Sequence, residues 1–168
     1  MQTTATVYKG SSKNVIIPSL QSFAVFEFTN RYSIFDWGAM PDLLDKKGES
    51  LAMTGALFFE LLSKKGIQHH YLGLVDENFQ DIAVGETSNF MKVKAVNVHR
   101  PTLTDAGYDY SFYNRKPVDC LVPLEVIFRW GAPKGSSVLK RHPEIKEGTR
   151  FPRPIVEFTT KLEKGDRL

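Results

Sequence analysis

The sequence has little cysteine, little net charge and no long apolar run. Its single cysteine, Cys120, excludes an internal disulfide and lies in an apolar stretch, so we expect a packing residue in a reducing compartment. The net charge of +3 is too small to indicate a nucleic acid or a membrane surface as partner. The N-terminus lacks the charged-then-apolar pattern of a signal peptide, and no apolar run approaches the length of a membrane span. We therefore expect a cytoplasmic protein.

The composition is that of an ordinary globular protein. Of the 168 residues, 42% are hydrophobic and 24% are charged. These values suit one soluble domain, or one domain plus part of another. A chain of this length can bury a real core.

Apolar periodicity predicts several strands and one long helix. The helix covers residues 50–65, with Ser50 as N-cap and Gly66 as C-terminal stop. Its apolar stripe is expected to face the core: Leu51, Gly55, Phe58 and Leu62. The strand patterns lie at 7–17 (with a turn), 22–30, 69–75, 90–98, 118–122, 124–128 and 155–160.

The most informative stretch runs from Val126 to Phe158. A strand breaks there into a glycine, proline and serine segment, which a short basic run follows. Glycine lets a backbone approach a ligand, serine donates from its hydroxyl and its N–H at a helix start, and arginine binds anions as a bidentate donor. The pattern favours an anion site, with a polar loop of solvated cations as the alternative. The residues concerned are Arg129, Gly135, Ser136, Ser137 and Arg141.

A second glycine-containing turn lies between two strand patterns near the N-terminus. It reads Gly10-Ser11-Ser12-Lys13. The glycine and serine N–H groups can face phosphates, and Lys13 adds a positive charge. Small glycine hairpins are common, so the alternative is a turn without ligand.

At these motifs the sequence resembles the SAICAR synthetase (phosphoribosylaminoimidazole-succinocarboxamide synthase) family. Two positions depart from the family pattern: Ser11 stands where the family has a lysine, and Trp130 where it has an asparagine. The matching segments are VYKGSSK (7–13), SIFDWG (33–38), FELLSKKGI (59–67), PLEVIFRW (123–130), GAPKGSSVLKR (131–141) and PIVEF (154–158).

The resemblance implies three groups of site residues. Asp36 and Arg141 are expected to act near the reacting substrates. An Asx-turn aspartate remains the alternative for Asp36, and a solvated loop lysine for Lys47. Contacts to ATP, including backbone bonds to adenine, are expected from Gly10, Ser11, Ser12, Lys13, Cys120, Leu121 and Val122. Contacts to the other substrates are expected from Ser33, Lys47, Arg129, Gly135, Ser136 and Ser137.

The resemblance also implies the fold. We expect an α+β protein in which an antiparallel sheet with one helix forms a kinase-like or ATP-grasp-like ATP-binding lobe. This nucleotide-covering lobe would span residues 1–122, and residues 123–168 would begin a second, substrate-binding lobe. The chain then corresponds to the amino-terminal two-thirds of the family enzyme. The acidic residues that hold Mg²⁺ in the family would lie beyond its end.

The function implied is an ATP-dependent ligase of purine biosynthesis. It would join L-aspartate to carboxyaminoimidazole ribotide through an acyl phosphate, with ATP and Mg²⁺ as cofactors. Its partners would be small-molecule substrates, and a homo-oligomer is compatible with the sequence. No nucleic acid or membrane partner is expected.

Two other functions remain open. One is a catalytically inactive or divergent paralogue that binds a phosphorylated nucleotide, which the residues at positions 11 and 130 favour. The other is a kinase-like small-molecule phosphotransferase, although no HRD-type catalytic loop occurs in the sequence. Residues 76–117 are the least family-like part, and their role stays open.

Overall fold

The computed structural model describes residues 5–34 and 37–160. They belong to two compact units, which divide between Ala95 and Val96. This division falls earlier in the chain than the predicted lobe boundary at residue 122. The assignment of residues 96–122 to the nucleotide-covering lobe stays a prediction.

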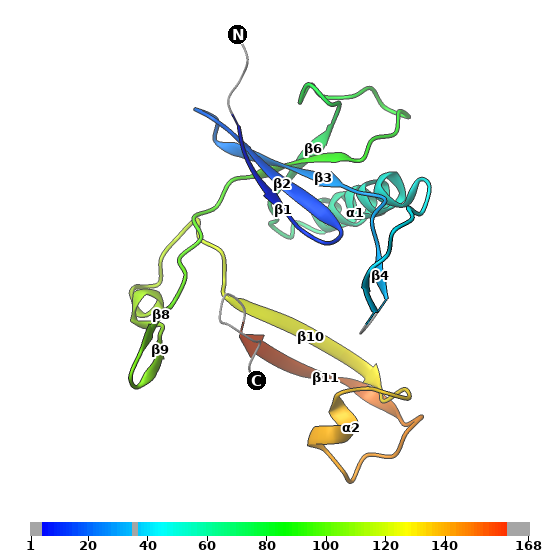
Figure 1. Ribbon diagram of the computed structural model, residues 1–168, viewed down its shortest axis with the longest axis vertical. Helices are drawn as coiled ribbons and strands as arrows, with labels where there is room; N and C mark the ends of the chain where they lie inside the picture. Colours follow the sequence, from blue (N-terminus) through cyan, green and yellow to red (C-terminus); the bar gives the residue numbers. More distant parts are fainter. Residues whose placement is uncertain (1–4, 35–36, 161–168) are drawn as a thin grey trace. The chain divides into compact units, whose positions relative to one another are not determined.

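The first unit is built on a five-stranded antiparallel sheet with the order β1-β2-β3-β7-β6 (Figure 1). The predicted strands at 7–17, 22–30, 69–75 and 90–98 are confirmed, with the last three shorter than expected. A small hairpin follows β3, and each of its strands, β4 (Ser33–Ile34) and β5 (Gly38–Ala39), is two residues long. The sheet strands are β1 (Ala5–Lys9), β2 (Lys13–Pro18), β3 (Phe23–Phe28), β6 (Tyr71–Val75) and β7 (Phe90–Lys94).

Helix α1 (Lys47–Lys64) packs against the sheet through small residues. Its buried positions are Gly48, Ala52 and Ala56. The predicted core stripe is wrong in part, because the Leu51 and Phe58 side chains are 40% and 61% exposed. Small side chains let the helix axis approach the strands closely, and they set which face of the helix turns inward. The core cluster consists of Ala24, Ala56, Met91 and Val93.

The helix begins at Lys47, and the predicted N-cap Ser50 is wrong. The preceding residue, Lys46, has a left-handed backbone with φ 56° and makes no side-chain cap. A residue from outside the helix satisfies one of its first N–H groups: Asn30 Oδ1 accepts from Gly48 N at 2.9 Å. A tertiary contact therefore replaces the local cap.

The predicted stop at Gly66 is confirmed. Gly66 has φ +70°, and its N–H donates to Ser63 O at 2.9 Å. The next N–H, of Ile67, donates to Leu62 O at 3.0 Å. This pair of bonds is the Schellman motif that a C-terminal glycine makes possible.

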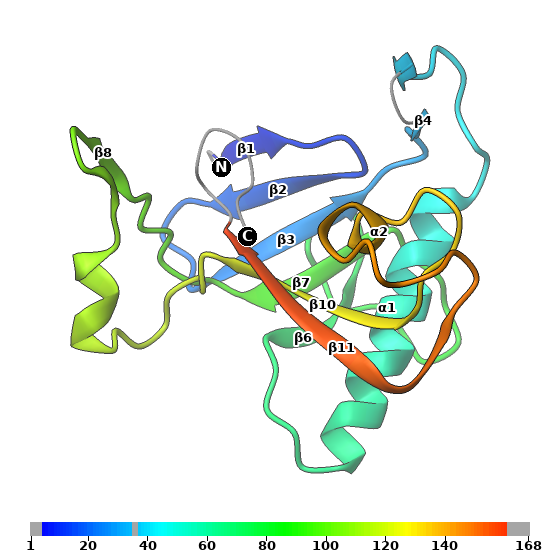
Figure 2. The same cartoon turned by 90° about the horizontal axis from the view of Figure 1, so that it is seen from below.

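The second unit contains a long antiparallel ribbon, β10 (Leu124–Gly131) with β11 (Arg150–Thr160), and the one-turn helix α2 (Val138–Arg141) lies in the loop between them (Figure 2). Strand β11 begins five residues before the predicted start at Ile155 and includes Pro152 and Pro154. Proline is tolerated because each strand of a two-stranded ribbon has a free edge.

Residues 96–122 precede the ribbon and form a short hairpin and one helical segment. The hairpin pairs β8 (Thr102–Thr104) with β9 (Gly107–Asp109), and the 3₁₀ helix η2 (Ser111–Arg115) follows. The predicted strand at 118–122 is wrong, because that segment makes only an isolated bridge between Cys120 and Asn97. The left-handed backbone of Asp119, with φ 50°, interrupts an extended conformation.

Together these elements confirm the predicted α+β class with antiparallel sheets. One long helix covers one face of a sheet in the first unit. A ribbon with a loop at its tip forms the main part of the second.

Gly48 of α1 lies in close contact with the end of β3. A Cβ on Gly48 would stand 2.4 Å from Phe28 O, which is backbone and cannot move away cheaply. We expect Gly48→Ala to destabilise the protein by about 1–3 kcal/mol, as overpacked cores do. Urea unfolding followed by circular dichroism measures the change.

Gly55 on the same helix is the matched control. A Cβ there would meet only the flexible end of Met91, at 3.1 Å. Replacing an interior helical glycine by alanine gains up to about 1 kcal/mol. Gly55→Ala should therefore leave stability unchanged or raise it, and a larger loss for Gly55→Ala than for Gly48→Ala would contradict the packing described.

Candidate functional site

The glycine turn between β1 and β2 has the tight geometry that requires glycine at its first position. Gly10 N donates to Lys13 O at 3.0 Å, and a Cβ on Gly10 would stand 2.6 Å from that same oxygen. Ser11 and Ser12 at the tip are exposed. The structure thus brings together the four residues predicted to contact ATP phosphates.

Lys13 turns from the tip toward the aromatic residues of the sheet. Its Nζ lies 4.2 Å from the ring centroid of Phe26 and 5.8 Å from that of Phe28. Partial burial lowers the pKa of Lys13 below its ordinary value. The contact to the ring face favours the charged ammonium, and it holds the cation over β3, the central strand of the sheet.

Three predicted site residues follow β3 in the chain: Ser33, Asp36 and Lys47. Ser33 is exposed on β4, and Asp36 lies outside the described residues. Lys47 is half-buried, and its Nζ donates to the carbonyl oxygens of Thr29 at 3.2 Å and Arg31 at 2.8 Å. Lys47 therefore ties the segment after β3 to the start of α1. A ligand contact of Lys47 stays a prediction.

In the second unit, two arginines share one carboxylate. Arg129 Nε and Arg141 Nη2 each donate to one oxygen of Glu157. Arg129 Nη2 also donates to Ser137 Oγ at 2.9 Å. Two guanidinium groups against one carboxylate leave this cluster, Arg129, Ser137, Arg141 and Glu157, with one surplus positive charge. It brings together three of the residues that were predicted to form one anion site.

Partial burial makes the cluster a fixed arrangement of charges. The side chains of Arg129, Arg141 and Glu157 are 19%, 28% and 10% exposed. The hydrogen bond from Arg129, followed by that from Arg141, lowers the pKa of Glu157 below its ordinary value. The carboxylate is therefore charged at neutral pH and orients both guanidinium groups.

The loop before α2 brings one serine hydroxyl, that of Ser137, to this cluster. Gly135 has φ +77°, a conformation that favours glycine, and α2 is anchored by the fully buried Val138. The hydroxyl of Ser136 is buried, and within the described chain it has no hydrogen-bond partner. Because α2 is a single turn, it offers no helix N-terminus to an anion, and the predicted anion contacts of this loop would come from its side chains.

The residues expected near adenine lie in the segment before β10. Leu121 N donates to Asn97 O at 2.8 Å, so this N–H is already occupied. Leu121 O accepts from Tyr113 at 3.3 Å, and Cys120 Sγ lies 3.7 Å from Pro117 O. Val122 is exposed. Adenine contacts of Cys120, Leu121 and Val122 stay a prediction.

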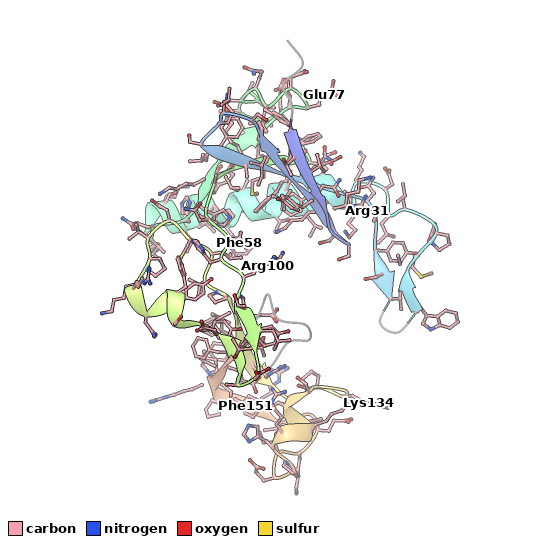
Figure 3. The ribbon with its side chains drawn as sticks, turned by 60° about the vertical axis from the view of Figure 1, so that its left-hand side comes forward. Arg31, Phe58, Glu77, Arg100, Lys134 and Phe151 are labelled. Carbon is pink, nitrogen blue, oxygen red and sulfur yellow. The ribbon has the colours of Figure 1, made fainter. Side chains whose placement is uncertain are left out.

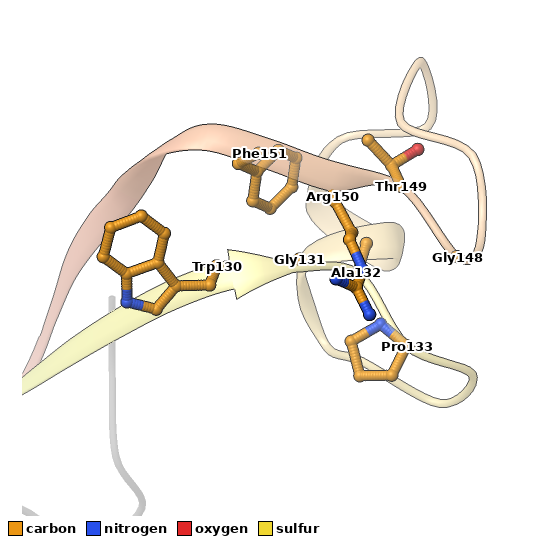
Figure 4. Close-up of a pocket in the computed structure, with 8 residues that line it drawn as sticks. All are labelled: Trp130, Gly131, Ala132, Pro133, Gly148, Thr149, Arg150 and Phe151. Atoms are coloured by element: carbon orange, nitrogen blue, oxygen red, sulfur yellow. The ribbon is translucent and has the colours of Figure 1, made fainter.

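A cavity of about 440 Å³ lies at the base of the loop between β10 and β11 (Figure 4). Trp130 and Phe151 line it, and the Arg150 side chain extends toward Pro133. Within this cavity, Gly131 is required because a Cβ would stand 2.8 Å from Thr149 O. The predicted site residues are not among its lining residues, so the cavity is separate from the arginine cluster.

Sequence reasoning missed Glu157, although a signal was present. In the ladder, Ile127 pairs with Glu157 and Arg129 pairs with Ile155. Side chains two residues apart share one face of a strand, so Arg129 and Glu157 are diagonal neighbours on one face. The register that creates this neighbour relation could not be known before the two strands were paired.

Two further observations concern the described part of the chain alone. Its helices include none that is long and apolar enough to cross a membrane. Among residues 5–34 and 37–160, no three histidine, cysteine, aspartate or glutamate side chains gather to hold a metal ion.

The fold defines a class of protein. An α+β arrangement with antiparallel sheets is shared with solved enzymes of ATP-grasp-like fold. A family model described as SAICAR synthetase matches residues 6–167. The chain therefore belongs to the SAICAR synthetase family.

Individual relatives agree with this family. A protein of Archaeoglobus fulgidus, which carries the name phosphoribosylaminoimidazole-succinocarboxamide synthase provisionally, is 44% identical over 84% of this chain and 46% of its own length. The synthase of Thermoplasma volcanium is 32% identical over 86% of this chain and 45% of its own length. The chain thus spans about half the length of the curated relatives it matches, so the expected share of two-thirds is wrong.

Solved structures show the same similarity. A SAICAR synthetase (type 2) in complex with ADP superposes with a TM-score of 0.62 at 27% identity, over 93% of this chain and 50% of that one. The enzyme of Saccharomyces cerevisiae, solved with SAICAR, also has a TM-score of 0.62 at 18% identity, over 95% of this chain and 52% of that one. The second similarity concerns the fold alone.

The pKa of Glu157 leads to a prediction about acid stability. Because its folded-state pKa is lowered, the stabilisation is present above the ordinary carboxyl value and is lost as the pH falls through the folded-state pKa. We expect Glu157→Gln to be less stable than wild type at neutral pH. The two stabilities should converge in acid, where wild-type Glu157 is protonated. Urea midpoints measured from neutral to acid pH give both curves.

Glu147→Gln is the matched control, because Glu147 is exposed in the loop between the same two strands. Its stability should follow the wild-type curve at every pH. A constant difference between wild type and Glu157→Gln across the acid range would show that the charge of Glu157 does not stabilise the cluster.

Proposed function

We propose that this chain is part of an ATP-dependent ligase that joins L-aspartate to carboxyaminoimidazole ribotide, giving SAICAR, ADP and phosphate. The observation that carries the proposal is the cluster of Arg129, Arg141 and Ser137 on Glu157, in a chain that belongs to the SAICAR synthetase family. The ADP bound to one solved relative supports a nucleotide as the common ligand. The cytoplasm is the compartment we expect for this reaction.

The proposed chemistry activates a carboxylate. The ribotide carboxylate oxygen attacks the γ-phosphorus of ATP, and the bond to the ADP oxygen breaks. The amine of aspartate then attacks the carbonyl carbon of the acyl phosphate and loses a proton. Phosphate leaves with the bonding electron pair. No protein nucleophile is required, so the protein acts by positioning the reactants and by neutralising phosphoryl charge.

The arginine cluster of the second unit is assigned to the ribotide. The arginine cluster binds the phosphate of the ribotide: Arg129 and a serine of the loop donate hydrogen bonds, and the surplus positive charge favours the dianion. The buried hydroxyl of Ser136, which has no partner in the described chain, is available as one such donor. Arg141 shares the Glu157 carboxylate with Arg129, and we assign to it a contact with the reacting substrate.

The glycine turn has the matching role toward ATP. Its exposed serine tip offers N–H groups, and Lys13 lies at the start of the next strand. Asp36 is proposed to act near the substrates, and backbone groups of residues 120–122 near adenine. Mg²⁺ belongs to the proposal as the ion that neutralises phosphate charge. Among residues 5–34 and 37–160, no set of side chains gathers to hold this ion.

An ADP-release assay tests the proposal. The chain and the complete gene product would each receive ATP, Mg²⁺, the ribotide and aspartate. Turnover that depends on aspartate is expected at least from the complete product. ADP binding without turnover by either would contradict the ligase and favour a non-catalytic nucleotide-binding paralogue.

Substituting Arg129 tests the role of the cluster. A hydrogen bond to a charged group contributes about 1.5–3 kcal/mol, which corresponds to roughly ten- to a hundredfold in binding. Arg129→Ala in the active protein should therefore raise the KM for the ribotide by that factor and leave the KM for ATP nearly unchanged. Steady-state kinetics with each substrate varied in turn measures both values.

Arg153→Ala is the control, since Arg153 is an exposed arginine of the same β10–β11 ribbon. It should leave both KM values unchanged. An equal effect of the two substitutions on the ribotide would show that net charge, and not the cluster, attracts this substrate.

A further inference from the structure

Both carbonyl groups that flank the tip of the glycine turn are held by residues at and after the end of β3. Gly10 O accepts from Arg31 Nη2 at 2.9 Å. Ser12 O accepts from the backbone N of Thr29 at 2.9 Å and from its hydroxyl at 3.1 Å. The turn is therefore fastened from outside its own hairpin.

Arg31 is itself fixed on two sides. The same Nη2 atom donates to Asn14 Oδ1 at 2.7 Å, and Asn14 is only 7% exposed. Asn14 Nδ2 in turn donates to Glu27 Oε2 at 2.7 Å. The backbone oxygen of Arg31 accepts from Lys47 Nζ at 2.8 Å. Figure 3 shows Arg31 at the end of the sheet from which the chain continues to β4.

Because the peptide bond is planar, the hydrogen bond from Arg31 to Gly10 O also fixes the direction of the next N–H group, that of Ser11. The C=O of Gly10 and the N–H of Ser11 belong to one trans peptide unit and point in opposite directions. When the guanidinium of Arg31 holds the oxygen, the N–H of Ser11 must point away from Arg31. Within the described chain this N–H meets no acceptor, and Ser11 is exposed.

The same argument applies one peptide further along. Thr29 holds the oxygen of Ser12, and so it fixes the plane that carries the N–H of Lys13. Oriented backbone N–H groups in a turn form a concave site for anions. The side chain at position 11 is a serine without charge, which increases the share of phosphate binding that falls to the backbone.

We infer that Arg31 is a positioning residue that orients the Ser11 N–H toward the phosphates of the nucleotide. The inference rests on the proposed function, since the nucleotide is the ligand assigned to this turn. Both hydrogens of the Arg31 Nη2 atom are engaged, by Gly10 O and by Asn14 Oδ1, so this amino group acts on the turn and not on a ligand. It acts through the peptide plane between Gly10 and Ser11.

ADP titration of the nitrogen-15-labelled chain tests the inference. In wild type, the amide resonance of Ser11 should shift on addition of ADP. In Arg31→Ala, the dissociation constant for ADP should rise about tenfold and the Ser11 shift should be lost, because the peptide plane is free to rotate. Arg31→Lys should recover part of the affinity, since one ammonium can donate to both acceptors. Unchanged affinity and an unchanged Ser11 shift in Arg31→Ala would overturn the inference.

A control variant and a measurement without ligand distinguish a failure of the nucleotide assignment from a failure of the role given to Arg31. Lys64→Ala removes one exposed cation from the same unit, far along α1 from the turn, and it should bind ADP as wild type does. Backbone order parameters of Ser11 and Ser12, measured without ligand, should fall in Arg31→Ala alone. If wild type does not bind ADP, the nucleotide assignment fails and the inference fails with it. If ADP binds normally and the order parameters do not change, only the role of Arg31 is wrong.

Discussion

The carboxylate of Glu157 is the constraint on which the second unit's candidate site depends. Two guanidinium groups repel each other, and a partly buried anion between them removes that cost and fixes both directions. Arg129 comes from β10, Arg141 from α2 and Glu157 from β11, so the cluster also ties the loop to the ribbon. The cluster keeps one surplus positive charge, which would attract an anionic substrate.

In the first unit, hydrogen bonds to backbone carbonyl oxygens have the fixing role that the Glu157 carboxylate has in the second. The segment 29–31 binds the glycine turn through Arg31 and Thr29, and it binds the start of α1 through Asn30. Lys47 closes this arrangement by donating to the segment's own carbonyl oxygens. The result is a rigid support under an exposed turn. A turn that binds phosphate through its backbone needs such support, since its N–H groups are useful only in fixed directions.

Local signals in the sequence predicted the strands of the first unit, the end of α1 at Gly66 and the residues of the glycine turn. They did not predict where α1 begins, because its N-terminal N–H group is capped by Asn30 from elsewhere in the chain. Glu157 was missed because only the pairing register of β10 and β11 shows that it lies beside Arg129. The buried face of α1 was misjudged because contact through glycine and alanine counts for little on a hydrophobicity scale. Tertiary contacts thus decided these three features.

The central claim is that the protein to which this chain belongs uses ATP to activate a carboxylate. Oxygen-18 transfer tests it most directly. The complete gene product would receive ribotide labelled in its carboxylate, with ATP, Mg²⁺ and aspartate, and the phosphate released would be analysed by mass spectrometry. Our account predicts one labelled oxygen in each phosphate, because the acyl phosphate breaks at its carbonyl carbon. Phosphate without label, formed at the same rate as ADP, would contradict carboxylate activation.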